Sequence, residues 1–429
     1  MGRKIWYQRI LYMVLAGLVI YTVYAVYSYM DRAIPDRIHM VVNEEGKFEF
    51  GLPIEAQLSS QSEEVVFSGE SNIPSHEIVL NLSDEFSVFS EKTGTYDLKL
   101  KLFGILPFKE IKVNVVEEEQ VIPCGFQVGI YLETNGVMVV GTARMADTEG
   151  KVVEPAAELV RSGDYITAVD GNVITDKNDL ISCVKNCNGN AITLTVNRNG
   201  ERLEESLRPV EVENGEYKLG IWVRDDAQGI GTMTYVKADG SFGALGHGVS
   251  DVDTGKLLEA SGGKLYPARI LSIIKGESGS PGGLSGVIEY QESHVLGAIE
   301  TNCEQGIYGT ASEELYELCE EYCCDAYMDI AFKQEVELGA AQVRCEIDGV
   351  IRDYQIQITK LDNSPGNVNK GMEIRVVDEA LLQETNGIVQ GMSGSPILQN
   401  GKLIGAVTHV FVNDSTKGYG IFIENMLEN

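Results

Sequence analysis

Apolar residues follow three patterns along the chain. One uninterrupted apolar run, Ile10–Met30, lies near the N-terminus and is about the length that crosses a bilayer. Most later stretches alternate apolar with polar residues, as in Tyr96–Leu102, which is typical of half-buried β-strands. Helical spacing is limited to the short segments Pro155–Val160, Asp179–Lys185 and Ser312–Tyr322. The pattern predicts a mostly β protein behind one N-terminal transmembrane helix.

Breaks in this pattern divide the chain into four parts. Residues 1–34 form a short stub and the anchor, and residues 35–118 form a small β module that ends in acidic Glu117–Glu119. Residues 119–208 mix strands with helical segments, which predicts an α+β domain. The remaining part, 209–429, holds roughly 220 residues of short, glycine-punctuated strands, a length that suits two packed β-barrels.

The charge distribution limits the partners and predicts the topology. The net charge is −30 without any Lys/Arg-rich run, which argues against nucleic acid and favours protein partners. Because Arg3, Lys4 and Arg9 precede the apolar run, the positive-inside rule places everything after Asp31 outside the cytoplasm. A cleaved signal peptide is the alternative, but its apolar core would be shorter and would end at small residues.

The eight cysteines do not define a metal site. They could pair outside the cytoplasm, but their scattered spacing fits no disulfide framework. The pairs Cys183/Cys187 and Cys319/Cys323 lack the second Cys or His pair that a zinc site needs. We therefore expect no metal and no cofactor.

The α+β segment carries a recognisable signature. Gly163-Asp164-Tyr165-Ile166 followed by Val169-Asp170-Gly171-Asn172-Val173 resembles the signature of bacterial PDZ domains. The resemblance implies binding of peptide ends by strand addition, with Phe126, Gln127, Val128 and Gly129 as the loop that holds the ligand carboxylate. The alternative is a spacer that binds nothing.

A turn near the C-terminus suggests a nucleophile. Gly391-Met392-Ser393-Gly394-Ser395-Pro396 precedes an apolar strand and a hairpin, as the nucleophile turn does in chymotrypsin-like peptidases. Ser393 is the candidate, and the amides of Gly391 and Ser393 could form the oxyanion hole. The same pattern also occurs as a plain tight turn. A second turn at Gly276–Gly283, containing Ser278, lacks the following apolar strand and is interpreted as a loop.

A serine nucleophile needs a base and a group that orients it. Among the five histidines, His247 alone lies between two glycines at the end of an apolar segment, which leaves its imidazole uncrowded. Asp378, at the end of a short apolar strand, is the candidate third member. Spacing alone does not select it, because other carboxylates would serve as well: Asp251, Asp253, Asp325 and Asp329.

Several segments together resemble one family. The anchor, Pro107–Val115, the PDZ-like segment, Gly229–Tyr235, Phe242–Asp251 and Gly391–Ile397 are similar to the stage IV sporulation protein B family of signalling serine peptidases. The resemblance implies that His247, Ser393 and Asp378 match the family's catalytic residues. It also implies a place in the forespore membrane, self-cleavage, and cleavage of a membrane-tethered regulator of an intramembrane protease that processes a late sigma factor.

Two hypotheses follow from these observations. The first is a membrane-anchored serine endopeptidase with a PDZ domain and a chymotrypsin-like double barrel. The alternative is a non-catalytic PDZ adaptor that binds peptide termini outside the cytoplasm. Only the first predicts a serine that reacts with fluorophosphonates, because such reactivity needs an activated hydroxyl.

Overall fold

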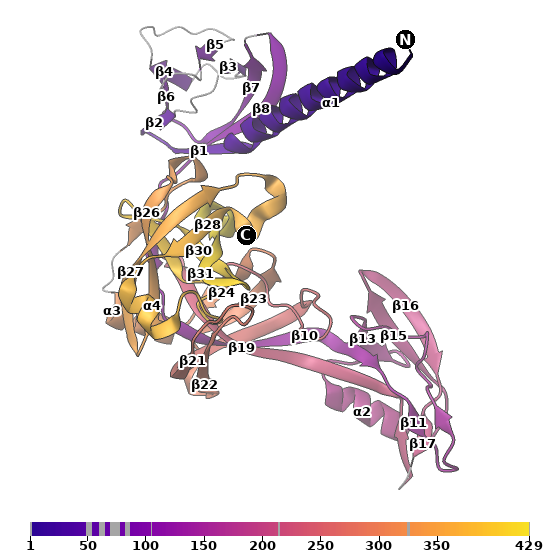
Figure 1. Ribbon diagram of the computed structural model, residues 1–429. Helices are drawn as coiled ribbons and strands as arrows, with labels where there is room; N and C mark the ends of the chain where they lie inside the picture. Colours follow the sequence, from indigo (N-terminus) through magenta and orange to yellow (C-terminus); the bar gives the residue numbers. More distant parts are fainter. Residues whose placement is uncertain are drawn as a thin grey trace.

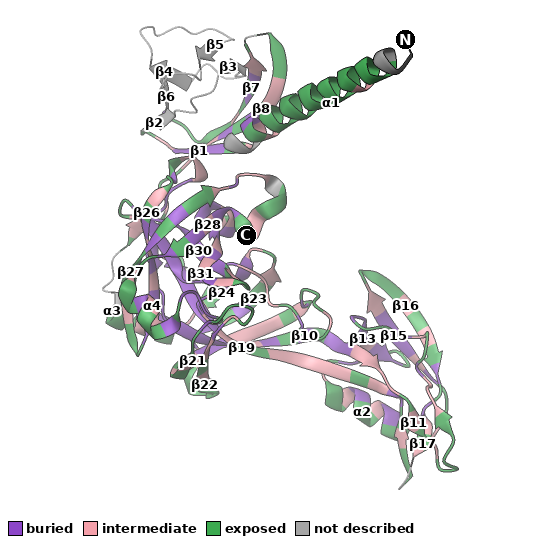
Figure 2. Cartoon of the chain, viewed as in Figure 1, coloured by how far each residue is buried: buried purple, intermediate pink, exposed green. Residues whose placement is uncertain are grey.

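A computed structural model describes residues 2–48, 54–59, 65–68, 78–81, 86–103, 105–212, 215–323 and 327–428. Helix α1 (Gly2–Ala33) projects from the rest of the chain (Figure 1), and Figure 2 shows it exposed along most of its length. Among the described residues, one helical stretch, Trp6–Asp31, is long and apolar enough to cross a membrane. The predicted apolar helix is confirmed, and it suits a single-pass anchor.

The described residues of the module after α1 form two small sheets, with strand orders β1-β8-β7-β3-β5 and β2-β6-β4. The last turns of α1 belong to its core, because Met30 and Ile34 are buried with Leu98, Leu100 and Ile111. The strands are β1 (Arg37–Val41), β2 (Glu45–Phe48), β3 (Ile54–Ser59), β4 (Val65–Ser68), β5 (Ile78–Asn81), β6 (Phe86–Ser90), β7 (Gly94–Leu102) and β8 (Leu106–Val116).

The first barrel is closed because β10 pairs with β21 on one side and with β19 on the other. The pairings run β10-β21-β23-β24-β20-β19, and β19 pairs back to β10. Val128, Leu132, Met233, Phe242 and Leu265 are part of its core. The elements are β10 (Gln127–Thr142), β19 (Ile221–Lys237), β20 (Ser241–Ala244), β21 (Ala260–Ile274), β23 (Gly297–Cys303) and β24 (Gly306–Ala311), with flanking β9 (Gln120–Pro123), β22 (Gly283–Ile288), β25 (Met328–Asp329), α3 (Glu313–Cys323) and the short helix η2 (Glu292–His294).

A second closed barrel follows, in the strand order β26-β27-β28-β31-β30-β29. Its interior is filled by alternate residues of these strands, among them Val343, Ile356, Ile374 and Ile404. The elements are β26 (Gly339–Ile347), β27 (Val350–Leu361), β28 (Met372–Val376), β29 (Pro396–Gln399), β30 (Lys402–Phe411), β31 (Asp414–Phe422), α4 (Glu379–Thr385), α5 (Ile423–Leu427), η3 (Lys333–Glu335) and η4 (Pro365–Lys370). The predicted mostly β fold with two barrels is confirmed.

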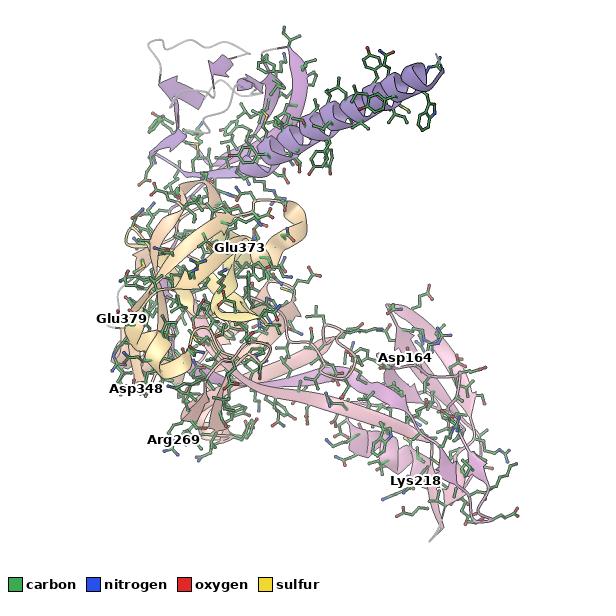
Figure 3. All side chains as sticks on the ribbon, viewed as in Figure 1. Asp164, Lys218, Arg269, Asp348, Glu373 and Glu379 are labelled. Atoms are coloured by element: carbon green, nitrogen blue, oxygen red, sulfur yellow. The ribbon has the colours of Figure 1, made fainter. Side chains whose placement is uncertain are left out.

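A small α+β domain extends from the first barrel, because β10 and β19 continue beyond it and pair again at Val139 and Val223. The buried Asp164, labelled in Figure 3, lies in this domain and forms an ion pair with the partly buried Arg198 (2.7 Å). The predicted helix at 179–185 lies within α2, but 155–160 forms turns. The elements are β11 (Met145–Ala146), β12 (Val152–Val153), β13 (Tyr165–Val169), β14 (Asn172–Val173), α2 (Lys177–Asn186), β15 (Ile192–Arg198), β16 (Glu201–Leu207), β17 (Val210–Val212) and β18 (Glu216–Lys218).

Strand pairing differs from the domain division expected from the sequence. Residues 127–133 of β10 pair with β21 and with the barrel half of β19, so they belong to the first barrel and not to the small domain. The small domain is thus an insertion between two strands of the first barrel. Although Asn-Gly at 135–136 is typical of a hairpin turn, β10 continues through these residues with an irregular register between Glu133 and Met138.

Candidate active site

Ser393 lies in the turn between α4 and β29, and two glycines give this turn its shape. Gly391 has φ 102° and Gly394 has φ 95°, a backbone region that other residues rarely adopt. A Cβ on Gly394 would lie 2.2 Å from the carbonyl oxygen of Thr232. Glycine at position 394 therefore lets the turn of the second barrel touch the first barrel.

The first barrel holds this turn through hydrogen bonds. The backbone N–H of Thr232 donates to the Ser393 carbonyl (3.0 Å), and the Thr234 hydroxyl donates to the Gly394 carbonyl (2.8 Å). The Thr232 hydroxyl donates to the Gly391 carbonyl (2.8 Å), and the Gln127 amide donates to that hydroxyl (3.0 Å). Because Thr232, Thr234 and Gln127 are all buried, these bonds are shielded from water. The turn that carries Ser393 is thus fixed across the seam between the barrels.

Two backbone amides in the turn remain available for a ligand. Among the described residues, neither the N–H of Gly391 nor that of Ser393 has a protein acceptor, whereas Met392, Gly394 and Ser395 all donate to backbone carbonyls. Unpaired donors beside a nucleophile are what an oxyanion hole requires. The structure leaves free the two amides predicted for that role.

His247 follows β20 in a tight backbone turn. Leu245 and Gly246 before it have φ 70° and 67°, which turns the chain so that the imidazole is partly buried. Its Nδ1 lies 2.9 Å from the carbonyl oxygen of Gly248. Because a carbonyl only accepts, Nδ1 carries the proton and Nε2 has a free lone pair. Burial lowers the pKa of His247, and the Gly248 hydrogen bond partly opposes this, so the ring is neutral near pH 7.

Strand β30 is the segment that both side chains approach. The Ser393 hydroxyl donates to the Thr408 carbonyl (2.7 Å). A Cβ on Gly246, next to His247, would lie 3.2 Å from Thr408 Cγ2, and the rings of His247 and His409 are 4.8 Å apart. Folding therefore brings Ser393 and His247 to the same short stretch of β30. Among the described residues the Ser393 hydroxyl bonds only to Thr408, so it does not donate to His247 in this state.

Asp378 does not contact His247. It is the N-cap residue of α4, where its carboxylate accepts hydrogen bonds from the N–H groups of Ala380 and Leu381 and from that of Gln355 (3.1 Å). Figure 3 shows the neighbouring Glu379 on the outside of the second barrel. The structure thus gives Asp378 a capping role, and the Gly248 carbonyl takes the position on His247 Nδ1 expected for a carboxylate.

The other acidic candidates are also engaged away from His247. Asp251 is buried and pairs with Arg224, and it accepts from the backbone of Asp253. Asp253 also pairs with Arg224 (2.8 Å), and Asp329 accepts from Gln120 (2.7 Å). The last candidate, Asp325, lies outside the described residues. In the described part of the chain, no hydrogen bond or ion pair joins a carboxylate to His247.

The predicted peptide-binding loop has a different position. Phe126, Gln127, Val128 and Gly129 are buried in the first barrel, where 127–129 pair with strands on both sides. They therefore present no open edge to a peptide, and Gln127 instead supports the turn that carries Ser393 through its contact with Thr232. Its role was not visible in the sequence, because it depends on contacts with residues more than a hundred positions away.

The second serine turn is a loop, as predicted. It connects β21 and β22, and the exposed Ser278 hydroxyl donates to the Asn413 carbonyl at 3.3 Å. His409 on β30 also lies beside His247, with ring centroids 4.8 Å apart. Its pKa is lowered to about 4 by burial and by the positive charge that His247 and Lys370 can carry.

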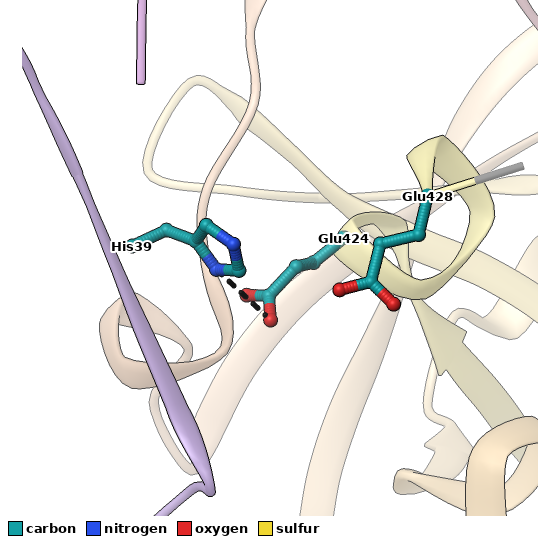
Figure 4. A group of neighbouring side chains, drawn as sticks. All are labelled: His39, Glu424 and Glu428. Atoms are coloured by element: carbon teal, nitrogen blue, oxygen red, sulfur yellow. Dashed lines mark ion pairs between the residues drawn. The ribbon is translucent and has the colours of Figure 1, made fainter. Parts of the chain in front are cut away.

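One cluster elsewhere has the residue types of a metal site. His39, Glu424 and Glu428 offer ligand atoms within 4.8 Å of one another (Figure 4). Glu424 already pairs with Lys333 (3.2 Å) and His39 (3.2 Å), and Glu428 pairs with Arg37 (2.9 Å). Because cations neutralise both carboxylates, we interpret the cluster as an ion-pair network that joins β1 to α5.

Comparison with known proteins adds a family match. Residues 215–427 match the sequence family described as SpoIVB peptidase S55. Among curated proteins, none matches the chain.

Parts of the chain are also similar to solved structures. The PDZ domain of the SdrC-like protein from Listeria monocytogenes has 20% identity and a TM-score of 0.18, over 21% of this chain and 87% of that one. The active form of the Rv3671c protease from M. tuberculosis has 14% identity and a TM-score of 0.26, over 47% and 72%. Its inactive form has 12% identity and a TM-score of 0.25, over 46% and 81%.

Proposed function

Because residues 215–427 belong to the SpoIVB peptidase S55 family, which makes the chain a serine peptidase, we propose that Ser393 is its nucleophile and His247 its general base. The observation that carries this proposal is the meeting of the two residues at Thr408 and His409, from different barrels. The lowered pKa of His247 supports it, since a base must be unprotonated at the working pH.

The arrangement supports acyl transfer in two halves. The Ser393 oxygen attacks the scissile carbonyl carbon while its proton moves to His247 Nε2, and the carbonyl oxygen becomes an anion held by the amides of Gly391 and Ser393. The C–N bond then breaks, and the leaving amine takes the proton from His247. In the second half, His247 takes a proton from water, which attacks the acyl-enzyme carbonyl. The Ser393 oxygen then leaves with the proton from His247, and the carboxylic acid product is released. The Gly248 carbonyl keeps the imidazole in the required tautomer throughout.

The hydrogen bond of Ser393 to Thr408 defines a resting arrangement. Its hydroxyl proton points at a carbonyl, which cannot remove it. Attack requires the hydroxyl to turn from the Thr408 carbonyl toward His247. Substrate binding that places an N–H donor on the Thr408 carbonyl would favour this rotation.

A pair of serine variants tests the proposal. Ser393→Ala in the full-length chain, in lipid nanodiscs, removes the nucleophile and should abolish both fluorophosphonate labelling and peptide cleavage. Ser278→Ala is the matched control, since Ser278 lies in a similar but exposed turn, and it should label as the unmodified chain does. Labelling that survives in the Ser393 variant would refute the assignment.

We further propose a signalling role outside the cytoplasm. The family resemblance supports cleavage of the chain itself and of a membrane-tethered regulatory protein that controls processing of a late sigma factor during sporulation. The single apolar helix supports attachment to the forespore membrane. The small PDZ-like domain is suited to control, since β10 and β19 run from it to Gln127 and Thr232 beside the nucleophile turn. Fragments that form from the intact chain but not from its Ser393→Ala variant would verify self-cleavage.

A further inference from the structure

The turn between β7 and β8 carries three apolar side chains that no other part of the described chain covers. Phe103 is 65% exposed, Ile105 is 79% exposed and Leu106 is 58% exposed. On either side of Gly104, Phe103 has φ 53° and the Ile105 N–H donates to the Leu102 carbonyl (3.2 Å). Three exposed apolar side chains within four positions of the sequence indicate a surface that meets an apolar partner.

The position of this tip relative to the anchor is fixed by side-chain contacts. Phe108, just after the tip on β8, packs edge-on against Tyr27 within the apolar span, with ring centroids 5.3 Å apart. The Lys109 ammonium donates to the carbonyls of Asp31 (3.1 Å) and Ile34 (2.8 Å) at the end of the helix. The helix and the hairpin therefore move as one unit.

The direction of the strands carries the tip toward the bilayer. Ile111 shares a core with Ile34, whereas Phe108 contacts Tyr27, so β8 followed backwards runs parallel to α1 toward its N-terminus. The three strand residues from Phe108 to Ile111 cover about 10 Å, and the seven helical residues from Tyr27 to Ile34 cover the same length. The strand and the helix therefore advance equally along their shared direction. Continuing past Phe108 brings the tip level with the helix N-terminal to Tyr27. Figure 1 shows the hairpin and α1 projecting from the same side of the molecule.

The residues of α1 at this level mark a membrane interface. Tyr21, Tyr24, Tyr27 and Tyr29 cluster in the outer part of the span, and tyrosine is enriched where bilayer meets water. We propose that the β7–β8 tip, comprising Phe103, Ile105 and Leu106, inserts into the outer leaflet of the membrane that α1 crosses. The chain is thereby attached at two points, which limits rotation of the module about the helix axis and holds the barrels at a set orientation.

Lipid is the occupant that the geometry favours over a protein. The tip is held beside the membrane-spanning helix by the Tyr27 and Lys109 contacts, so the bilayer is already present at its level. The inserted backbone is short, and the Ile105 amide is already hydrogen-bonded within the turn, which reduces the cost of leaving water. Burying these side chains in lipid removes apolar surface from water.

Tryptophan fluorescence in lipid nanodiscs tests the proposal on the full-length chain. Trp6 and Trp222 are the two native tryptophans, and both are replaced by Phe to give a silent background. Ile105→Trp places the probe at the tip. Val252→Trp is the matched control, because Val252 is 85% exposed on a loop of the peptidase region. Phe103→Trp provides a second probe in the same turn.

The outcomes are distinct. Insertion predicts that the tip probes emit at shorter wavelength than the control, and that lipids brominated near the headgroup quench them several-fold more than the control. Emission and quenching equal to those of the Val252 probe would overturn the proposal, since the tip would then be in water. A blue-shifted tip probe that brominated lipid does not quench would also overturn it, because the side chain would then lie against protein, such as a second copy of the chain.

Discussion

Replacing Gly394 by alanine tests how strongly the active site depends on the close approach of the two barrels. The added Cβ would lie 2.2 Å from the Thr232 carbonyl oxygen and 2.6 Å from the Leu245 amide nitrogen, whereas ordinary contact begins at 3.4 Å. The shortfall against Thr232 is 3.4 − 2.2 = 1.2 Å. Both obstacles are backbone atoms, so they cannot rotate away, and the turn must shift relative to the first barrel.

The expected effect follows from this displacement. Moving a reacting group by about 1 Å can cost about 100-fold in rate. The extra carbon also destabilises the fold, by about 1–3 kcal/mol for overpacking and about 1–2 kcal/mol for the positive φ. Because Leu245 lies two residues before His247, the same clash disturbs the base as well as the nucleophile.

Gly401→Ala separates strain from steric overlap. Gly401 also has a positive φ, 79°, but nothing lies within 4 Å of an added Cβ. The assay is the rate of fluorophosphonate labelling of the folded protein, with stability measured by urea unfolding. We expect at least about 100-fold slower labelling for the Gly394 variant and a near-normal rate for the Gly401 variant. Equal labelling of the two variants would refute the reasoning.

Two further predictions concern protonation and capping. Since the folded state lowers the pKa of His247, labelling should be constant above about pH 6.5 and should fall in acid as the ring is protonated below that value. Because folding favours the neutral ring, His247 contributes fully to the free energy of unfolding above about pH 6.5. This contribution is lost as the pH falls through the lowered pKa. A labelling rate that still rises between about pH 7 and pH 8 would contradict this. Asp378→Ala should lower the free energy of unfolding by about 1–2 kcal/mol in urea titrations through loss of the α4 cap, whereas Asp378→Ser should restore much of it. Equal stability of the three proteins would exclude the capping role.

Local patterns in the chain were enough to predict several features. The apolar run of α1, the alternation that produces strands, and the glycines around Ser393 each depend on neighbouring residues alone. His247 could be selected because glycines flank it within the same segment. These predictions needed no knowledge of which strands pair.

Tertiary structure decided the rest, because strand periodicity does not specify a partner. Pairing of β10 with β19 and β21 placed Phe126 to Gly129 in the first barrel. Gln127 therefore supports the turn that carries Ser393 and is not exposed for peptide binding. An Asp after a short strand could orient a histidine or cap a helix. The backbone N–H groups that Asp378 accepts from show that it caps α4, and they are known only from the structure. The partner of His247 Nδ1 is a backbone carbonyl. Every residue has such a carbonyl, so the residue types in the sequence cannot identify this partner, and only the fold does.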